Sequence, residues 1–214
     1  MIEMKAALFD LDGTLLDSEG RYTEIWTKIG QKYRPDIPDL AYVIKGTTLP
    51  QIMSYFAPED REAVYKELWE GENALQHEFF PGAMEYVRLL QKLGVKTAIV
   101  TSSDMKKINH VLDCCPEIRE FDMMLTSEDF TKGKPDPECY LLAAERLGFR
   151  ADECVVFEDA FSGIEAGKRA GMRVVAMAHT LTAEQLEGKC DRVVTGSWHE
   201  LIAEVHSAST LRPQ

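Results

Sequence analysis

The chain has no long hydrophobic run, and its first residues show neither the basic patch nor the apolar region of a signal peptide. Apolar stretches such as Val174–Ala178 fall far short of the roughly 18 residues that a membrane-spanning helix needs. These absences predict a protein without a membrane span, and we expect to find it in the cytoplasm.

Cysteine and histidine lack the spacing of a metal site or of a disulfide framework. The five cysteines are an odd number, no two of them are spaced as Cys-x-x-Cys, and the five histidines show no metal-ligand pattern. We interpret the cysteines as reduced thiols, as in a cytoplasmic protein, and expect surface or packing roles for the histidines. These residues are Cys114, Cys115, Cys139, Cys154 and Cys190, with His77, His110, His179, His199 and His206.

Positive charge is also scarce, since 24 Lys and Arg residues face 36 Asp and Glu residues, which gives a formal net charge of −12. A nucleic-acid-binding protein usually carries a basic face, and anionic membranes attract basic segments, so neither partner is expected. A small phosphorylated metabolite is compatible with this composition, because cations can be placed locally. The 214 residues suffice for one large or two small domains with a substantial core, and we expect a monomer.

An acidic cluster near the N-terminus, KAALFDLDGT at Lys5–Thr14, organises the chain. Its apolar run Ala6–Phe9 has the length of a buried strand and stops at Asp10. Strand side chains repeat with a period of two, so Asp10 and Asp12 can face one reacting centre, where one attacks and the other moves a proton. An acidic turn after a strand would contain the same residue types, and the later motifs decide between the two interpretations.

Helical patterning without any strand pattern fills the next part of the chain. Ser18 is expected to cap the first of these helices, because its hydroxyl can accept a hydrogen bond from the first turn. The expected helices cover residues 19–33, one or two short helices within 41–56 broken around Gly46, and a longer helix over 58–78. We interpret this segment as a helical insert.

From Pro81 onward, helices alternate with short apolar strands. Expected helices cover residues 82–93, 105–113, 137–147 and 162–170, expected strands cover 95–101, 123–126, 154–157 and 173–177, and a strand–helix unit over 192–205 precedes a loose tail at 207–214. This alternation predicts an α/β fold, a doubly wound parallel sheet with helices on both faces. We expect residues 1–17 and 81–214 to form this core domain and residues 18–80 to form a small helical cap domain.

In such sheets ligands bind beyond the carboxyl ends of the strands, so polar residues at several strand ends should form one site. Thr101 ends one expected strand, Ser102 follows it, and a helix begins close behind, a place that suits a phosphate group. Simple capping of that helix by Ser103 or Asp104 is the competing interpretation, and both can hold together.

Lys134 lies in the stretch GKPDPE between two of these elements. Pro135 favours an extended conformation at Lys134, and Asp136 with Pro137 is typical of a helix start. Lys134 would then project from a rather fixed loop as a point charge. A solvated lysine is the ordinary outcome for this residue type, and we expect that role for Lys132.

Glu158 and Asp159 end another apolar strand. If they meet Asp10, like charges about 4 Å apart repel by roughly 4 kcal/mol at an effective dielectric near 20, so the cluster needs a cation or raised pKa values. Only oxygen ligands are on offer, which fits magnesium and does not fit zinc. The set predicts phosphoryl transfer through an aspartyl-phosphate, with Asp10 as the nucleophile and Asp12 as the group that moves protons.

The stretches DLDGT, VTSS, GKPDPE and FEDAFSGIEAG, in this order, resemble the four motifs of the haloacid dehalogenase (HAD) superfamily. The resemblance covers essentially the whole chain, because the helical insert lies where that family carries a small helical cap. It implies a Rossmann-like fold for the rest of the chain. Dehalogenases and phosphonatases of the family lack an aspartate two residues after the nucleophile, so Asp12 argues against both. The nearest resemblance is to phosphatases and β-phosphoglucomutase-like members.

The resemblance also implies roles for the motif residues. Asp10 would be the nucleophile, and Asp12 would be the acid and base. The implied Mg²⁺ ligands are Asp10, the backbone carbonyl of Asp12, Asp159, and Glu158 directly or through water. The phosphoryl group would be held by Thr101 and the Ser102 backbone, with Lys134 as its counter-charge.

These features favour a magnesium-dependent phosphatase for a small phosphorylated metabolite, with a sugar phosphate as the expected substrate. A phosphomutase with the same site is the alternative, and a phospho-aspartate binding module without turnover is a third. β-Phosphoglucomutases carry a histidine on the first cap helix and an arginine after a Lys-Gly pair, where this chain has Tyr22 and Leu49, which weakens the mutase hypothesis. Residues of the insert expected at the substrate are Tyr22, Lys45, Gly46 and Thr47.

Overall fold

The structure is a computed structural model that describes residues 4–210. Its core is a six-stranded parallel sheet with the strand order β3-β2-β1-β4-β5-β6. The strands are β1 (Ala6–Phe9), β2 (Lys96–Val100), β3 (Met123–Leu125), β4 (Cys154–Glu158), β5 (Arg173–Met177) and β6 (Arg192–Val194). The expected doubly wound α/β fold is therefore confirmed.

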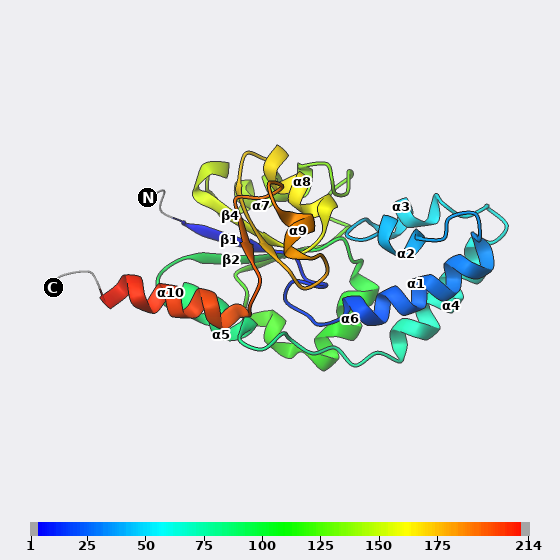
Figure 1. Cartoon of the computed structure of the whole chain (residues 1–214), viewed down its shortest axis with the longest axis horizontal. Coiled ribbons are helices and arrows are strands. Elements are labelled where there is room, and N and C mark those ends of the chain that lie inside the picture. The colour runs from blue at the N-terminus through cyan, green and yellow to red at the C-terminus, as the bar shows by residue number, and fades with distance from the viewer. Residues whose placement is uncertain (1–3, 211–214) are drawn as a thin grey trace.

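Helices cover both faces of this sheet (Figure 1). Ala7 and Phe9 of β1 point into one hydrophobic cluster, with α5, α6 and α10, whereas Ala6 and Leu8 point into a second cluster, with α7, α8 and α9. These helices are α5 (Ala83–Lys92), α6 (Met105–Cys114), α7 (Glu138–Leu147), α8 (Phe161–Arg169), α9 (Ala183–Leu186) and α10 (Trp198–Thr210). Burial on both faces explains why β1 is apolar throughout.

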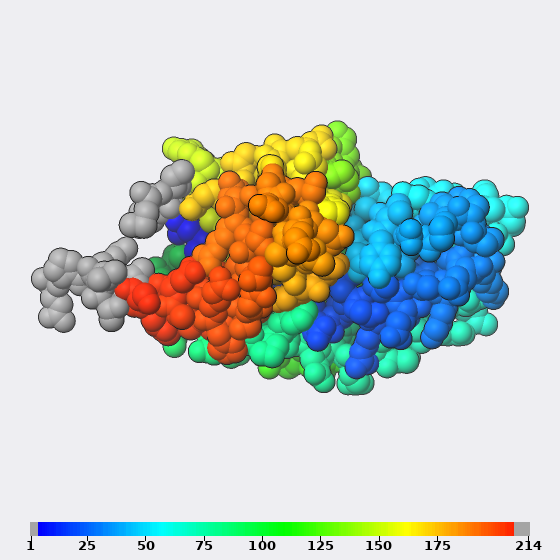
Figure 2. Space-filling model, in the orientation of Figure 1, coloured from blue at the N-terminus to red at the C-terminus, as the bar shows by residue number. Residues whose placement is uncertain are grey.

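Four helices lie beyond one end of the sheet and form the blue-to-cyan end of the molecule (Figures 1 and 2). They are α1 (Glu19–Tyr33), α2 (Leu40–Val43), α3 (Leu49–Met53) and α4 (Arg61–Asn73). A third hydrophobic cluster joins them, and its buried members all fall between Tyr22 and Leu75. Trp26 of α1 stacks on Phe56 within it, with ring centroids 6.3 Å apart.

The helix expected over residues 58–78 is shorter in the structure, because α4 ends at Asn73. The chain that follows returns to the core beside the segment that left it. Asp17 N–H donates to the Glu78 carbonyl at 2.9 Å, and Phe80 N–H donates to the Leu15 carbonyl at 2.8 Å. These bonds hold the two connections between sheet and helices side by side.

Ser18 takes the N-cap position of α1 as expected, although its side chain makes no capping bond, because the hydroxyl donates to Asp12 instead. Two smaller expectations were wrong. Helix α7 begins at Glu138, one residue later than expected, and Asp136 accepts a 3.1 Å hydrogen bond from the Glu138 N–H. The expected loose tail is helical as far as Thr210, since α10 packs Leu201 and Ile202 into the core, and residues 211–214 lie outside the described part.

Over residues 4–210, no helix is long and apolar enough to cross a membrane. The five cysteines, all within this range, form no disulfide.

Candidate active site

The carboxyl ends of three adjacent strands bring the sequence motifs together. β1 pairs with β2 on one side and with β4 on the other, so Asp10, Thr101 and Glu158 meet at one edge of the sheet. Asp10, Thr101, Glu158 and Asp159 are all buried. Ligand-binding residues of a parallel sheet lie beyond the carboxyl ends of its strands, and these residues lie there as the sequence predicts.

Lys134 reaches the centre of this edge and is fully buried. Its Nζ lies 2.5 Å from Asp10 Oδ1 and 2.7 Å from Glu158 Oε1. Burial alone would lower the pKa of this ammonium group, but Asp10 and Glu158 outweigh that effect and hold its pKa well above the ordinary value. The Lys132 side chain, by contrast, is exposed, and its ammonium group lies 3.9 Å from the Asp136 carboxylate.

Three carboxylates gather next to Lys134. Asp10, Glu158 and Asp159 each offer an oxygen, and these oxygens lie within 4.8 Å of one another. Burial raises the pKa of Asp10 to about 8 against the opposing effect of Lys134, and burial with neighbouring carboxylates raises the pKa of Asp159. Buried carboxylates this close together repel one another, and a cation would relieve that repulsion. Hard divalent cations prefer oxygen ligands, so the cluster fits magnesium.

Two motif glycines make room for this cluster. Gly13 has a φ of +76°, and a Cβ there would lie 2.1 Å from Asp159 Oδ2. A Cβ on Gly163 would lie 1.6 Å from Glu158 Oε1. Both positions exclude a side chain, which explains the glycines that follow the aspartates of the first and last motifs.

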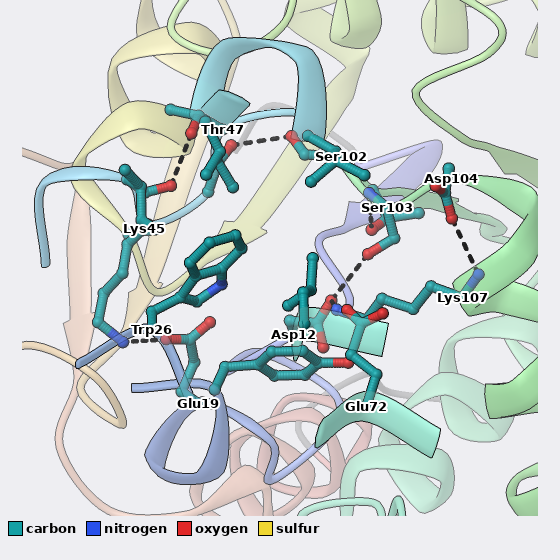
Figure 3. Close-up of a pocket in the computed structure, with 18 of the residues that line it drawn as sticks. Asp12, Glu19, Trp26, Lys45, Thr47, Glu72, Ser102, Ser103, Asp104 and Lys107 are labelled. Carbon is teal, nitrogen blue, oxygen red and sulfur yellow. Dashed lines mark hydrogen bonds and ion pairs between the residues drawn. The ribbon is translucent and has the colours of Figure 1, made fainter. Parts of the chain in front are cut away.

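The carboxylate of Asp12 is held in a different environment. It accepts a hydrogen bond from Ser18 Oγ at 2.7 Å and one from Lys107 Nζ at 2.7 Å. It also accepts one from Ser103 Oγ at 3.0 Å (Figure 3). Burial raises the pKa of Asp12, but the Lys107 ammonium outweighs it, so the pKa is lower than usual. The Lys107 Nζ also lies 3.8 Å from the centre of the Tyr22 ring. Asp10 and Asp12 therefore have separate partners and opposite pKa shifts.

Thr101 and Ser102 lie beside the carboxylates, at the start of the loop into α6. The Thr101 hydroxyl accepts from the Ser103 N–H at 3.1 Å, and Ser102 Oγ donates to the Gly46 carbonyl at 2.8 Å (Figure 3). Asp104 caps α6 by accepting from the Lys107 N–H at 2.9 Å. The capping interpretation thus holds for Asp104 and leaves the strand end available to a ligand.

A cavity of about 110 Å³ lies between these strand ends and helices α1–α4. The four residues of the insert that the sequence singled out, Tyr22, Lys45, Gly46 and Thr47, all line it. Lys45 forms an ion pair with Glu19, and the Thr47 hydroxyl donates to the Ile44 carbonyl at 2.6 Å (Figure 3). The rest of the wall on the helical side is largely apolar and aromatic, with Trp26, Ile44, Leu49, Ile52, Leu68 and Trp69.

A model of haloacid dehalogenase-like hydrolases matches residues 4–171. The chain belongs to this family. It is 34% identical over 188 residues to the phosphorylated carbohydrates phosphatase of Thermotoga maritima, covering 83% of this chain and 87% of that protein. Hexitol phosphatase A of Escherichia coli is 34% identical over 186 residues, 81% of this chain and 82% of that protein. A solved structure of a hydrolase from Pseudomonas syringae has a TM-score of 0.82 at 25% identity, covering 95% and 98% of the two chains.

Sequence reasoning missed three polar side chains in this haloacid dehalogenase-like hydrolase. Lys107 contacts Asp12, Tyr140 donates to Glu158 Oε1 at 2.9 Å, and Glu72 lines the cavity from α4. One weak signal pointed to Lys107, because the helix dipole disfavours a lysine in the first turn unless an acidic partner is near. Tyr140 and Glu72 fit ordinary helical periodicity, and no local pattern distinguishes them.

His77 is a buried histidine behind the cavity wall, and the hydrolase does not use it as a metal ligand within the described cluster. Its ring lies 6.3 Å from that of Tyr22 and 5.5 Å from that of His110. In the described structure neither ring nitrogen has a hydrogen-bond partner. Burial lowers its pKa to about 4, with Asp12 opposing and Lys107 adding to the effect.

Acidification is therefore expected to destabilise the fold through His77. Its folded-state pKa of about 4 lies below the ordinary 6.5, so the unfolded chain binds more protons between these values and the free energy of unfolding falls as the pH drops through them. Between pH 7 and pH 5 this group should remove about 2 kcal/mol. The free energy of unfolding, measured with urea at pH 7 and pH 5, should fall by about 2 kcal/mol less in His77→Leu than in the wild type. His199→Leu, at an exposed histidine, serves as the control, and an unchanged pH dependence in His77→Leu would refute the assignment.

Proposed function

We propose that the chain is a magnesium-dependent phosphatase that hydrolyses a small phosphorylated metabolite, with a sugar phosphate as the preferred substrate. The proposal is carried by the buried arrangement in which Lys134 lies between Asp10 and Glu158, 2.5 and 2.7 Å from their carboxylate oxygens. This places a cation against the candidate nucleophile, where the oxygens of a phosphoryl group would gather. The names of the Thermotoga and Escherichia relatives support the same substrate class.

In this proposal Asp10 attacks phosphorus in line, and its carboxylate oxygen forms an aspartyl-phosphate as the ester oxygen departs. Asp12 protonates that departing oxygen and later takes a proton from the water that hydrolyses the intermediate. The separate partners of the two carboxylates support this division, because Asp10 contacts Lys134 whereas Asp12 contacts Lys107. A bound magnesium ion would lower the raised pKa of Asp10, so that its carboxylate is ionised when it attacks.

The remaining residues of the site would hold the phosphoryl group and the metal. A bound magnesium ion would neutralise the charge that develops on the phosphoryl oxygens. The phosphoryl group would be held by Thr101, the Ser102 backbone and Lys134. The ion would be held by Asp10, the backbone carbonyl of Asp12, Asp159, and Glu158 directly or through water.

We also propose that residues 18–80 act as a cap domain that closes over the core, formed by residues 1–17 and 81–214. The separate hydrophobic cluster of α1–α4 supports this, because these helices can move as one body. Polar contacts join the two parts at the cavity: Ser102 Oγ with the Gly46 carbonyl at 2.8 Å, and Ser162 Oγ with the Lys45 carbonyl at 2.9 Å. Closure would exclude water around the ester, and the paired connections near Asp17 and Phe80 would serve as the hinge.

A mutase with the same core is the competing function, and one assay separates the two. The protein is incubated with β-glucose 1-phosphate, magnesium and trace glucose 1,6-bisphosphate, and glucose 6-phosphate and inorganic phosphate are both measured. We expect phosphate release to exceed isomerisation, because Tyr22 and Leu49 supply neither an imidazole nor a cation for a second phosphate. Glucose 6-phosphate forming much faster than inorganic phosphate would establish the mutase instead.

A further inference from the structure

Among the described residues that line the cavity, Lys106 is the one cation that no carboxylate neutralises. Three lysines line the cavity, and each already has a partner. Lys107 bonds to Asp12 at 2.7 Å, and Lys45 forms an ion pair with Glu19. The third, Lys106, lies 3.6 Å from the centre of the Trp69 ring and donates to the Tyr65 hydroxyl at 3.1 Å; these three residues line the cavity too. The described lining contains no arginine.

Glu72 adds a carboxylate to the same wall (Figure 3). In the part of the chain that the structure describes, no hydrogen bond or ion pair is formed by its side chain. Burial raises the pKa of Glu72, Lys107 opposes this effect and Asp12 adds to it, so Glu72 lies within electrostatic reach of the Asp12–Lys107 pair. Glu72 therefore adds a negative charge beside the Asp12–Lys107 pair, whose own charges cancel, and the Lys106 ammonium offsets it in part.

The Tyr22 hydroxyl lies in the same region. The residue is 6% exposed and lines the cavity, and its hydroxyl is buried without a hydrogen-bond partner among the described residues. Burial raises the pKa of Tyr22, Lys107 opposes this, and both Asp12 and Glu72 add to it, which places the hydroxyl near both carboxylates. An unsatisfied buried hydroxyl is destabilising, so a ligand group that bonds to it gains affinity.

Resting on the proposed function, we propose that Tyr22 and Glu72 form a subsite for the leaving alcohol. The Tyr22 hydroxyl and the Glu72 carboxylate bind hydroxyl groups of that alcohol next to the ester oxygen that Asp12 protonates. The charge of Glu72 repels an alcohol that carries a second phosphate or a carboxylate. The substrates are thus monophosphate esters of uncharged polyols and sugars, and a bisphosphate is excluded.

A matched pair of esters tests the exclusion. Glycerol 3-phosphate and 3-phosphoglycerate differ only in a CH₂OH group that is replaced by a carboxylate. With magnesium present, kcat/KM for phosphate release should favour the glycerol ester by at least about tenfold, and Glu72→Gln should shrink this preference about tenfold. Glu70→Gln is the control, because Glu70 lies on the same helix and pairs with Lys66 at the surface, 3.9 Å away.

A second pair tests the hydroxyl contact. n-Propyl phosphate lacks the two hydroxyls of the glycerol ester, and Tyr22→Phe keeps the ring beside Lys107 while it removes the hydroxyl. The preference for the glycerol ester over the propyl ester should fall by about fivefold or more in Tyr22→Phe. An unchanged preference would overturn the role of Tyr22, whatever the absolute rates.

Binding measurements keep the inference testable without turnover. Calorimetric titration of Asp10→Asn with magnesium and each ester should give a dissociation constant at least about tenfold weaker for 3-phosphoglycerate, and Glu72→Gln in that background should remove most of the difference. Equal affinities for the two esters would overturn the subsite. If the two esters bind with the expected difference in affinity but the wild-type protein releases no phosphate from any ester, the proposed function is overturned and the subsite stands.

Discussion

Asp10→Asn is expected to lower the rate of phosphate release by at least about four orders of magnitude. The substitution replaces the attacking carboxylate oxygen by an amide that cannot form the aspartyl-phosphate. The fold should survive, because Lys134 keeps its 2.7 Å contact with Glu158 and one of the mutually repelling carboxylates is removed. Phosphate release from a panel of sugar and polyol phosphates, with magnesium, measures the effect.

Asp113→Asn is the matched control for this substitution, since it makes the same chemical change on the exposed surface of α6. It should retain the wild-type rate. Thermal unfolding of both variants should stay close to that of the wild type, which separates loss of chemistry from loss of structure. A residual rate within about tenfold of wild type in a folded Asp10→Asn protein would show that Asp10 is not the nucleophile.

The core and its motif residues could be predicted because both follow from local patterns. Short apolar strands alternate with helices, and in a parallel sheet the residues after each strand meet at one edge, which is where Asp10, Thr101 and Glu158 lie. Lys134 was expected to project toward this edge, but its complete burial was not expected, since an isolated lysine is normally solvated.

The contacts that could not be predicted join segments far apart in the chain. The partners of Asp12 include Lys107, 95 residues away, and the position of Glu72 in the cavity depends on how α4 packs against α1. After α4 ends at Asn73, the chain pairs through backbone bonds of residues 78–80 with residues 15–17, a long-range pairing that no helical pattern encodes. Packing of the four helices therefore decides the substrate side of the cavity, whereas the reaction side is fixed by motifs.

Removal of magnesium is expected to abolish activity, with a loss of at least about a thousandfold, equivalent to several kcal/mol of transition-state stabilisation. The reason is the buried cluster in which oxygens of Asp10, Glu158 and Asp159 lie within 4.8 Å of one another, with Lys134 as the adjacent cation. Phosphate release is measured after chelation and again after magnesium is restored, which should recover the rate. Full activity in excess chelator would refute the metal assignment.

The same cluster predicts a stability effect that does not depend on catalysis. A cation that relieves repulsion among the carboxylates binds only the folded chain, so saturating magnesium should raise the unfolding temperature by several degrees. Asp159→Asn removes one ligand of the cluster and should abolish most of this rise together with the activity, whereas Asp113→Asn should keep both. If Asp159→Asn kept the full magnesium-induced rise, the ion would bind elsewhere, and the roles assigned to Glu158 and Asp159 would have to be withdrawn even if activity still required the metal.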